Sequence, residues 1–278
     1  MAEQDPGPVV QRIMLGGELR TLREAAKIST QDVATALDWY RAKVSKVETG
    51  TVRVTAAALS DLLKLYNADE TTIERVQRLG EEARRKTSPA RVPDWAKQYV
   101  NLEANATEIK LFYADFIPGM LQTRDYARAQ LSVSVVVPPA DVEQMAISRE
   151  HRAQHLRSGA PLLWVVLGEE ALRRTVGSRQ VQRGQLLRLR KLAELPNVTV
   201  QVMPLSGGAH TALGMSFVLL DLGRSRTVYI EGLTSSDYHV RPHHIQTYSL
   251  AFDRLRVASL GDRESLTIIN TLIDELEE

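Results

Sequence analysis

Apolar side chains recur at helical spacing through the first part of the chain. Leu15, Leu19 and Leu22 are separated by four and then three residues, which places them on one face of a helix. Residues 33–37 and 44–47 carry two further apolar faces, and residues 38–40 form a short break between them. The pattern therefore predicts a run of short helices, with little strand character, over residues 12–79.

Residues suited to cap helices stand at the boundaries of these segments. Ser29 or Thr30 can cap the second helix, Thr55 the fourth, and Thr71 is the candidate cap of a fifth. The third helix is expected to end near Thr49-Gly50, because a glycine just past the last turn is a common C-terminal stop. We therefore expect an all-α domain at residues 1–83.

The pattern changes after a charged, proline-interrupted stretch at residues 84–93, which we interpret as a linker. Beyond it, runs rich in β-branched and aromatic residues alternate with helical segments. Strands are expected at 108–113, 162–167, 198–203, 215–220 and 227–230, and helices at 123–131, 140–156, 179–194, 245–257 and 263–276. This mixture predicts a mixed α+β domain at residues 94–278 with a sheet covered by helices, and an α+β class overall. The order of the strands does not follow from the sequence.

The composition of the chain excludes several types of functional site. The 278 residues are 44% hydrophobic and 25% charged with a net charge of +1, as in soluble globular proteins of two domains. Since there is no overall basic excess, any contact with nucleic acid must come from a local cluster. The absence of cysteine excludes disulfides and cysteine-ligated metal sites. Without a signal-like or membrane-length apolar run, we expect a cytoplasmic protein with no membrane contact.

Residues 30–50 have the pattern of two helices joined by a tight turn. Helices of about seven or eight residues with a turn of three or four form a compact helix-turn-helix corner. The small Ala34 suits the point of closest approach, and the side chains expected to pack inward are Val33, Leu37, Val44 and Val47. The second helix of such a unit enters the major groove of DNA with its N-terminal residues toward the base edges.

A cationic face remains on the outside of that second helix. Arg and Lys suit the O6 and N7 acceptors of guanine, and the residues expected to contact bases are Arg41, Ala42, Lys43 and Lys46. Phosphate contacts are expected from residues around the two helix ends and the turn, namely Thr30, Gln31, Tyr40 and Arg53. The alternative is the solvated face of an amphipathic helix, but the apolar positions, the small residue and the short turn together favour DNA binding.

The stretches Leu19-Arg20-x-Leu22-Arg23-Glu24-Ala25-Ala26 and Val44-Ser45-Lys46-Val47-Glu48-Thr49-Gly50 resemble the XRE-type, lambda-repressor-like helix-turn-helix. The resemblance implies a five-helix domain over residues 12–79, in which Glu48 and Gly50 close the recognition helix and the four base-contacting positions face the groove. The chain departs from this family at Asp38-Trp39-Tyr40, where glycine and small residues are frequent. This bulky turn leaves the angle between the helices open and could place Tyr40 against the DNA backbone.

A second series of motifs runs through residues 91–276. It comprises Trp95, Tyr99, Glu103 and Ala106, then Ile117-Pro118-Gly119-Met120-Leu121-Gln122-Thr123-Arg124-Asp125-Tyr126-Ala127, Glu169-Glu170-Ala171-Leu172-Arg173, Gln185-Leu186 with Leu189, Asn197-Val198-Thr199-Val200-Gln201-Val202-Met203-Pro204, and Phe217. These residues resemble the C-terminal domain of a large set of actinobacterial XRE-type regulators, some described as antitoxin-like. The resemblance implies a small, neighbour-encoded partner protein that binds this domain, and it brings no catalytic residues.

Gln122, Thr123 and Arg124 are the candidate partner or ligand contacts of this larger domain. A strand, a turn and a helix in that order would place them at a strand end, where ligands often lie in mixed sheets. We favour a structural interpretation, in which Pro118-Gly119 makes a turn and Thr123 caps a helix.

Other polar clusters do not indicate a metal or catalytic site. The histidine groups lack the carboxylates and regular spacing of metal ligands; they are His151 with His155, and His239 with His243 and His244. Glu231, near Arg226 and Tyr229, is the nearest approach to a catalytic carboxylate, but no nucleophile and base accompany it. We expect no metal, no cofactor and no enzymatic activity.

The sequence therefore predicts a sequence-specific DNA-binding transcriptional regulator controlled by a small protein partner at its C-terminal domain. A homodimer is expected, because two recognition helices on one face of DNA would read symmetric half-sites about 10 bp apart. The alternative is an antitoxin-like protein whose main role is to sequester the small partner, with DNA binding serving autoregulation.

Overall fold

The computed structural model describes residues 7–84, 94–159, 161–223 and 225–277. Its contacts divide the chain into two compact units. The first comprises the N-terminal helices with residues 97–105 and 221–226, and the second comprises residues 91–96, 106–220 and 227–278. The predicted linker at residues 84–93 lies outside the described residues except for Arg84, so the predicted domain boundaries remain a prediction.

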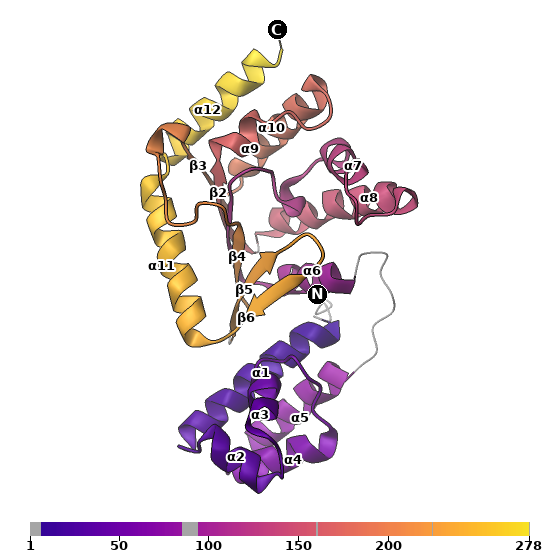
Figure 1. The fold of residues 1–278 in the computed structure, drawn as a ribbon, viewed down its shortest axis with the longest axis vertical. Coiled ribbons are helices and arrows are strands. Elements are labelled where there is room, and N and C mark those ends of the chain that lie inside the picture. The colour runs from indigo at the N-terminus through magenta and orange to yellow at the C-terminus, as the bar shows by residue number, and fades with distance from the viewer. Residues whose placement is uncertain (1–6, 85–93, 160, 224, 278) are drawn as a thin grey trace. The chain divides into compact units, whose positions relative to one another are not determined.

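Five short helices make up the N-terminal part of the first unit (Figure 1). They are α1 (Gly7–Ala25), α2 (Thr30–Ala36), α3 (Arg41–Glu48), α4 (Ala56–Leu65) and α5 (Glu70–Arg84). One apolar cluster fills the space between them; it includes Leu19, Leu59, Val33, Val44 and Val47, and the half-buried Leu37 packs against it. Ala34 is 1% exposed at the α2–α3 contact. The predicted all-α fold is confirmed.

The starts of these helices are fixed by short polar side chains. Ser29, rather than Thr30, caps α2: its hydroxyl accepts from the Asp32 N–H at 3.1 Å, and the Asp32 carboxylate accepts from the Ser29 N–H at 3.1 Å. Thr55 caps α4 as predicted. The prediction that Thr71 caps α5 is wrong, because Asp69 accepts from the Thr72 N–H at 2.8 Å and Thr71 lies inside the helix. Hydrogen bonds from Thr71 and Thr72 lower the pKa of Asp69 to about 2.

The first four helices end in the same backbone arrangement. The residue past each end has a positive φ, namely Lys27 (57°), Asp38 (52°), Gly50 (69°) and Asn67 (52°). The following amide then donates to a carbonyl five residues back, as from Trp39 to Ala34 at 2.8 Å. Only one of these four residues is a glycine, so the sequence indicates that helix end and does not indicate the other three.

The second unit contains a six-stranded sheet in the order β3-β2-β1-β4-β5-β6. The strands are β1 (Glu108–Tyr113), β2 (Leu162–Gly168), β3 (Val198–Met203), β4 (Phe217–Asp221), β5 (Arg226–Glu231) and β6 (Ser236–His239). β1, β2 and β3 are parallel, with Phe112 opposite Val166, whereas β5 and β6 are antiparallel. Parallel neighbours need crossover connections, which the chain supplies as helices.

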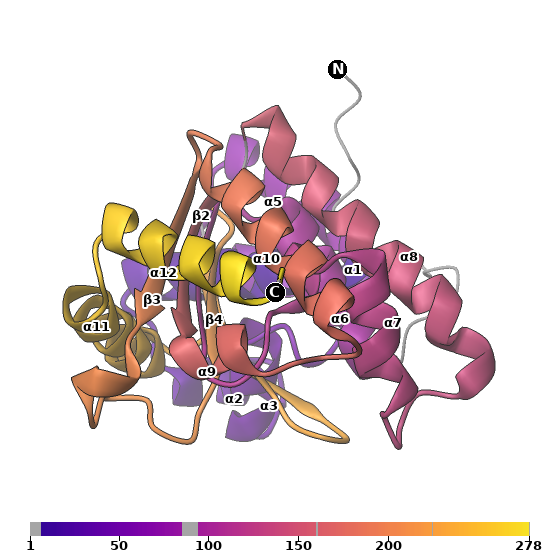
Figure 2. The same ribbon diagram turned by 90° about the horizontal axis from the view of Figure 1, so that it is seen from above.

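Helices cover both faces of this sheet (Figure 2). The remaining α-helices of the described residues are α6 (Asp94–Asn105), α7 (Arg124–Ser132), α8 (Val142–Arg152), α9 (Glu169–Arg173), α10 (Arg179–Ala193), α11 (Pro242–Ala258) and α12 (Asp262–Glu275). Figure 2 shows α11 on one face and α7, α8 and α10 on the other. Phe112, Val166 and Phe217 pack against Phe252 and Leu255 of α11. The predicted α+β architecture is confirmed, while β6, α6 and α9 were not predicted.

α1 passes very close to the last turn of α3 at Gly16. A Cβ atom at Gly16 would lie 2.6 Å from the Glu48 carbonyl oxygen and 2.7 Å from that of Val47. Only glycine leaves room for two backbone carbonyls at this distance, so Gly16 sets the separation of α1 and α3.

We predict that Gly16→Ala lowers the free energy of unfolding by about 1–3 kcal/mol, because the added methyl group must push α3 away. This loss should appear although alanine favours helix by about 1 kcal/mol over glycine. Gly184→Ala in α10 is the matched control, since a Cβ there meets no atom within 4 Å, and it should stabilise by about 0.4–1 kcal/mol. Urea unfolding followed by circular dichroism measures both changes, and stabilisation by both would contradict the close approach.

Candidate nucleic-acid interface

α3 presents one face to the helical core and the opposite face to solvent. Val44 and Val47 are 1% and 4% exposed, whereas Ala42 and Lys46 are exposed. Because successive residues of a helix turn by about 100°, the outward face is centred on Ala42 and Lys46. The other predicted base contacts, Arg41 and Lys43, lie at its two flanks. Ser45, which is half-buried and lies between Arg41 and Ala42 around the helix, also borders this face and was not predicted.

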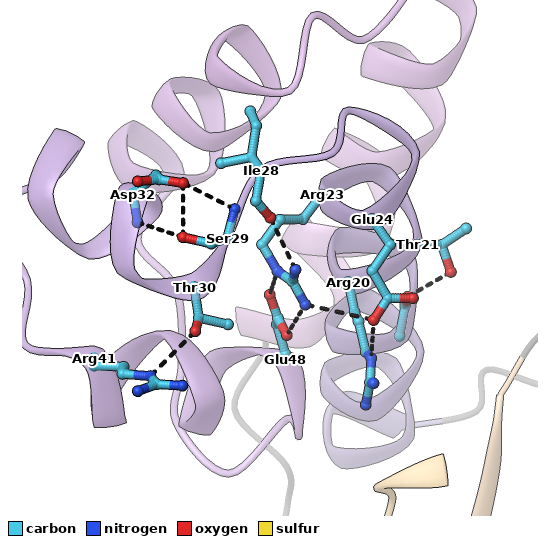
Figure 3. Close-up of polar contacts among 11 residues, drawn as sticks. Arg20, Thr21, Arg23, Glu24, Ile28, Ser29, Thr30, Asp32, Arg41 and Glu48 are labelled. Atoms are coloured by element: carbon cyan, nitrogen blue, oxygen red, sulfur yellow. Dashed lines mark hydrogen bonds and ion pairs between the residues drawn. The ribbon is translucent and has the colours of Figure 1, made fainter.

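Arg41 lies against the start of α2. Its Nε donates to the Thr30 hydroxyl at 3.3 Å (Figure 3), and the neighbouring Gln31 is exposed. The structure thus brings Arg41, predicted to contact bases, together with Thr30, predicted to contact phosphate. A guanidinium in this position can reach either the groove wall or the phosphate backbone beside it.

Lys43 is held over an aromatic ring from the turn. Its Nζ lies 3.9 Å from the centroid of the Trp39 ring, and Trp39 itself packs against the core. Asp38 adopts the left-handed conformation, which Asp tolerates better than most residues. Tyr40 points away from the core and is 63% exposed. The bulky turn therefore keeps a compact geometry, with Trp39 turned inward and Tyr40 outward.

Arg53, the remaining predicted phosphate contact, is exposed in the segment between α3 and α4. Arg12 of α1, which was not predicted, lies close to it. Burial lowers the pKa of Arg12, and repulsion from Arg53 lowers it further. Two cations held together in this way favour an anion between them, but nothing in the local pattern around Arg12 distinguishes it from other charges on α1.

A buried ion pair fixes the end of α3. Arg23 Nε donates to Glu48 Oε1 at 2.5 Å and Arg23 Nη2 to Oε2 at 3.1 Å, with the two side chains 10% and 9% exposed (Figure 3). Arg23 Nη1 also donates to the carbonyl of Ile28 at 3.0 Å. The hydrogen bond to Glu48 raises the pKa of Arg23. Burial and the nearby Glu48 charge raise the pKa of Tyr66 in the same region. One guanidinium thus joins α1, the α1–α2 connection and α3.

The three candidate residues of the larger domain have partners within that domain. Gln122 is fully buried, and its Nε2 donates to the Ile117 carbonyl and to Gln130 Oε1, each at 2.6 Å. The Thr123 hydroxyl accepts from the Tyr126 N–H and caps α7. Arg124 pairs with Glu143. These contacts fit the structural interpretation, and a ligand contact by the three residues remains a prediction.

Two groups of histidines were considered as metal ligands in the sequence, and no metal site was predicted at either. His151 is exposed, and the side chain of His155 lies outside the described residues. The rings of His243 and His244 are 4.0 Å apart, and burial with the nearby histidines lowers the pKa of His244. Within the described part of the chain, no three His, Cys, Asp or Glu side chains are grouped to hold a metal ion.

The described residues contain no helix with both the length and the hydrophobicity of a membrane-spanning segment.

We predict that Glu48→Ala lowers the free energy of unfolding by about 3 kcal/mol, because the nearly buried Arg23 charge is then left with only the exposed Glu24 carboxylate, 3.5 Å away, as its counter-charge. Glu24→Ala is the comparison, since it removes the other carboxylate near Arg23: Glu24 lies 2.8 Å from Arg20 and 3.5 Å from Arg23 but is 53% exposed, so its loss should cost less than about 1 kcal/mol. The double change Arg23→Met with Glu48→Met should recover most of the stability. Equal and small costs for Glu48→Ala and Glu24→Ala in urea unfolding would show that the pair does not hold α3.

Two protein families match separate parts of the chain. Residues 14–76, from α1 into α5, match a family described as a helix-turn-helix domain. Residues 96–271 match a family described as a domain of unknown function (DUF5753). No curated protein and no solved structure matches the chain significantly. The helix-turn-helix domain indicates a DNA-binding regulator. Because the second match covers more than half of the chain, the protein belongs to the DUF5753 family and carries a helix-turn-helix domain ahead of the region that defines it.

Proposed function

We propose that this protein is a sequence-specific DNA-binding transcriptional regulator that reads the major groove with α3. The observation that carries the proposal is the two-sided character of this helix. Its inner face is locked by Val44, Val47 and the Arg23–Glu48 pair, and its outer face exposes Ala42 and Lys46. A helix whose orientation is set by the core and whose outer face carries cations has the form required for base reading.

The proposed contacts divide by position on α3 and around it. Lys46 reads guanine acceptors, and the methyl group of Ala42 packs against a thymine methyl. Arg41 and Lys43 contact bases at the flanks, with Lys43 held in place by Trp39. The phosphates on either side are contacted by Thr30, Gln31, Tyr40 and Arg53, with Arg12 beside Arg53.

A homodimer follows from the small size of the reading surface. α3 has only eight residues, so one copy contacts few bases, and two copies on half-sites about 10 bp apart would supply the specificity of a regulator. We therefore propose that the protein binds palindromic DNA as a dimer. A selected site with a single half-site, bound by a monomer in sedimentation, would contradict this part.

A second candidate function is the antitoxin-like one, in which the larger domain holds a small neighbour-encoded protein and DNA binding serves autoregulation. The observation that favours it is an apolar segment after α7, where Val133 and Val135 are 81% and 84% exposed. Val135 lines a cavity of about 560 Å³ together with Pro138 and Val142. Co-expression with the small protein encoded next to this chain tests it: a complex that Val135→Asp disrupts supports the idea, and separate elution of both proteins opposes it.

For the DNA-binding function we predict that Lys46→Ala weakens binding to a selected DNA site by about 5- to 150-fold, the loss expected for one base contact. Lys43→Ala combined with Lys46→Ala should abolish the preference for that site over random DNA while the protein stays folded, because neither side chain is part of the core. Lys64→Ala on α4 removes the same charge from an exposed position on another helix. It should leave specific binding nearly unchanged.

Fluorescence anisotropy at several salt concentrations measures these affinities, since binding through cations weakens as salt rises. Circular dichroism confirms that each variant is folded. If the folded double variant keeps the affinity and preference of the unchanged protein, α3 is not the reading helix.

A further inference from the structure

A cluster of charged and aromatic side chains lies in the second unit, where α8 approaches the ends of β1 and β5. We call it the arginine cluster, and its members are Arg149, Arg152, Glu231, Tyr113 and Tyr229. The charges of Arg149 and Arg152 both lower the pKa of Glu231. The pKa of Arg149 is in turn lowered by Arg152 and raised by Glu231 and Tyr113. The DNA-binding function uses none of these residues.

Arg149 is anchored by neutral groups. Its Nη1 donates to Gln122 Oε1 and to Gln130 Oε1, both at 2.9 Å. Gln122 cannot turn away, because it is fully buried and its amide nitrogen is bound to Ile117 and Gln130. Among the described residues, no carboxylate lies within ion-pair distance of Arg149. The guanidinium is thus fixed along one edge while its charge lacks a direct counter-ion.

Arg152 places a second positive charge next to the first. A Cβ atom at Gly119 would lie 3.1 Å from Arg152 Nη1 and 3.5 Å from Arg149 Nε, so both side chains border the same glycine. Burial lowers the pKa of Arg149 to about 10, and repulsion by Arg152 is the next cause. Keeping two guanidinium groups together is costly, and an anion that bridges them removes that cost.

One carboxylate accompanies the two arginines. Glu231 is exposed at the end of β5, yet desolvation by the surrounding protein raises the pKa of its carboxyl, while the charges of Arg149 and Arg152 lower it. The Tyr229 hydroxyl is its hydrogen-bond partner. The rings of Tyr113 and Tyr229 are 4% and 1% exposed. Two guanidinium groups and one carboxylate therefore lie beside buried tyrosine rings, and water still reaches Glu231.

We propose that the arginine cluster binds a small molecule through its carboxylate or phosphate group. Arg149 and Arg152 contact the anion, and Gln122 and Gln130 are positioning residues that aim Arg149. The planar fork of arginine suits either anion through two parallel hydrogen bonds. Glu231, held by the Tyr229 hydroxyl, offers a polar contact to the rest of the molecule. The segment after β1 thus contributes to a ligand site, through the arginine that Gln122 holds rather than through Gln122 itself.

Thermal unfolding of the full chain tests the proposal. Inorganic phosphate and succinate are titrated separately, each against sodium chloride of equal ionic strength. Because a bound ligand stabilises the folded state in proportion to its occupancy, at least one of the two anions should raise the Tm in a saturable way. Phosphate alone, or succinate alone, identifies which anionic group the site prefers. Absence of any shift beyond the chloride control overturns the proposal.

Variants locate the binding. Arg149→Lys keeps the charge but removes the planar fork, and Arg152→Gln removes the second cation, so both should abolish the anion-dependent shift. Arg152→Gln decides the matter if Arg149→Lys does not fold. Arg128→Gln is the control, an exposed arginine on α7 that pairs with Asp125 and Glu143, and it should keep the full shift. Arg41→Gln with Lys46→Ala should keep it as well, which separates this site from the DNA-binding face. A shift that persists in Arg149→Lys and Arg152→Gln places the anion elsewhere and overturns the proposal.

Discussion

The buried ion pair between Arg23 and Glu48 determines how α3 is held on the helical core. Removing two charges from water is costly, and the cost is offset here by two hydrogen bonds between the charged groups and a third from Arg23 to the Ile28 carbonyl. Gly16 allows α1 to pass the carbonyls of Val47 and Glu48 at close range. Together these contacts fix the last turn of α3, so the rotation of the helix about its axis is set by the core.

Because the core sets the rotation of α3, the cations on its outer face point in a defined direction. With a net charge of only +1, the protein cannot attract DNA through its overall field, and the effect must be local. Arg41 is steadied by Thr30 and Lys43 by the Trp39 ring, so both lose less freedom on binding than unrestrained side chains would. Trp39 also explains the unusual turn sequence, because its ring contributes to the core and to the placement of a cation.

The sequence predicted what depends on local periodicity and missed what depends on contacts between distant residues. The leucines of α1 and the valines of α3 show their helical spacing directly, and Gly50 marks one helix end. Lys27 and Asn67 end helices in the same way but are not glycines. Thr71 and Asp69 are two residues apart and both can cap a helix, so only the hydrogen bond to Thr72 distinguishes them.

The candidate sites follow the same division. The exposed face of α3 could be predicted because it is the complement of an apolar stripe. The Arg23–Glu48 pair joins residues 25 positions apart. The arginine cluster brings residues of α8 together with the end of β5, and the strand order of the sheet cannot be predicted from any local pattern. Gln122 was singled out for its place after a strand, and its burial beneath Arg149 became visible only in three dimensions.

The most direct test of the account is the place of α3 on DNA. The chain contains no cysteine, so Ala42→Cys introduces a single attachment point for a photoactivated crosslinker at the centre of the outer face. Ala57→Cys, exposed on α4, is the matched control. We expect the label at position 42 to crosslink to bases of the major groove in a selected site, and the label at position 57 not to do so. Crosslinking to bases from position 57, with none from position 42, would contradict it.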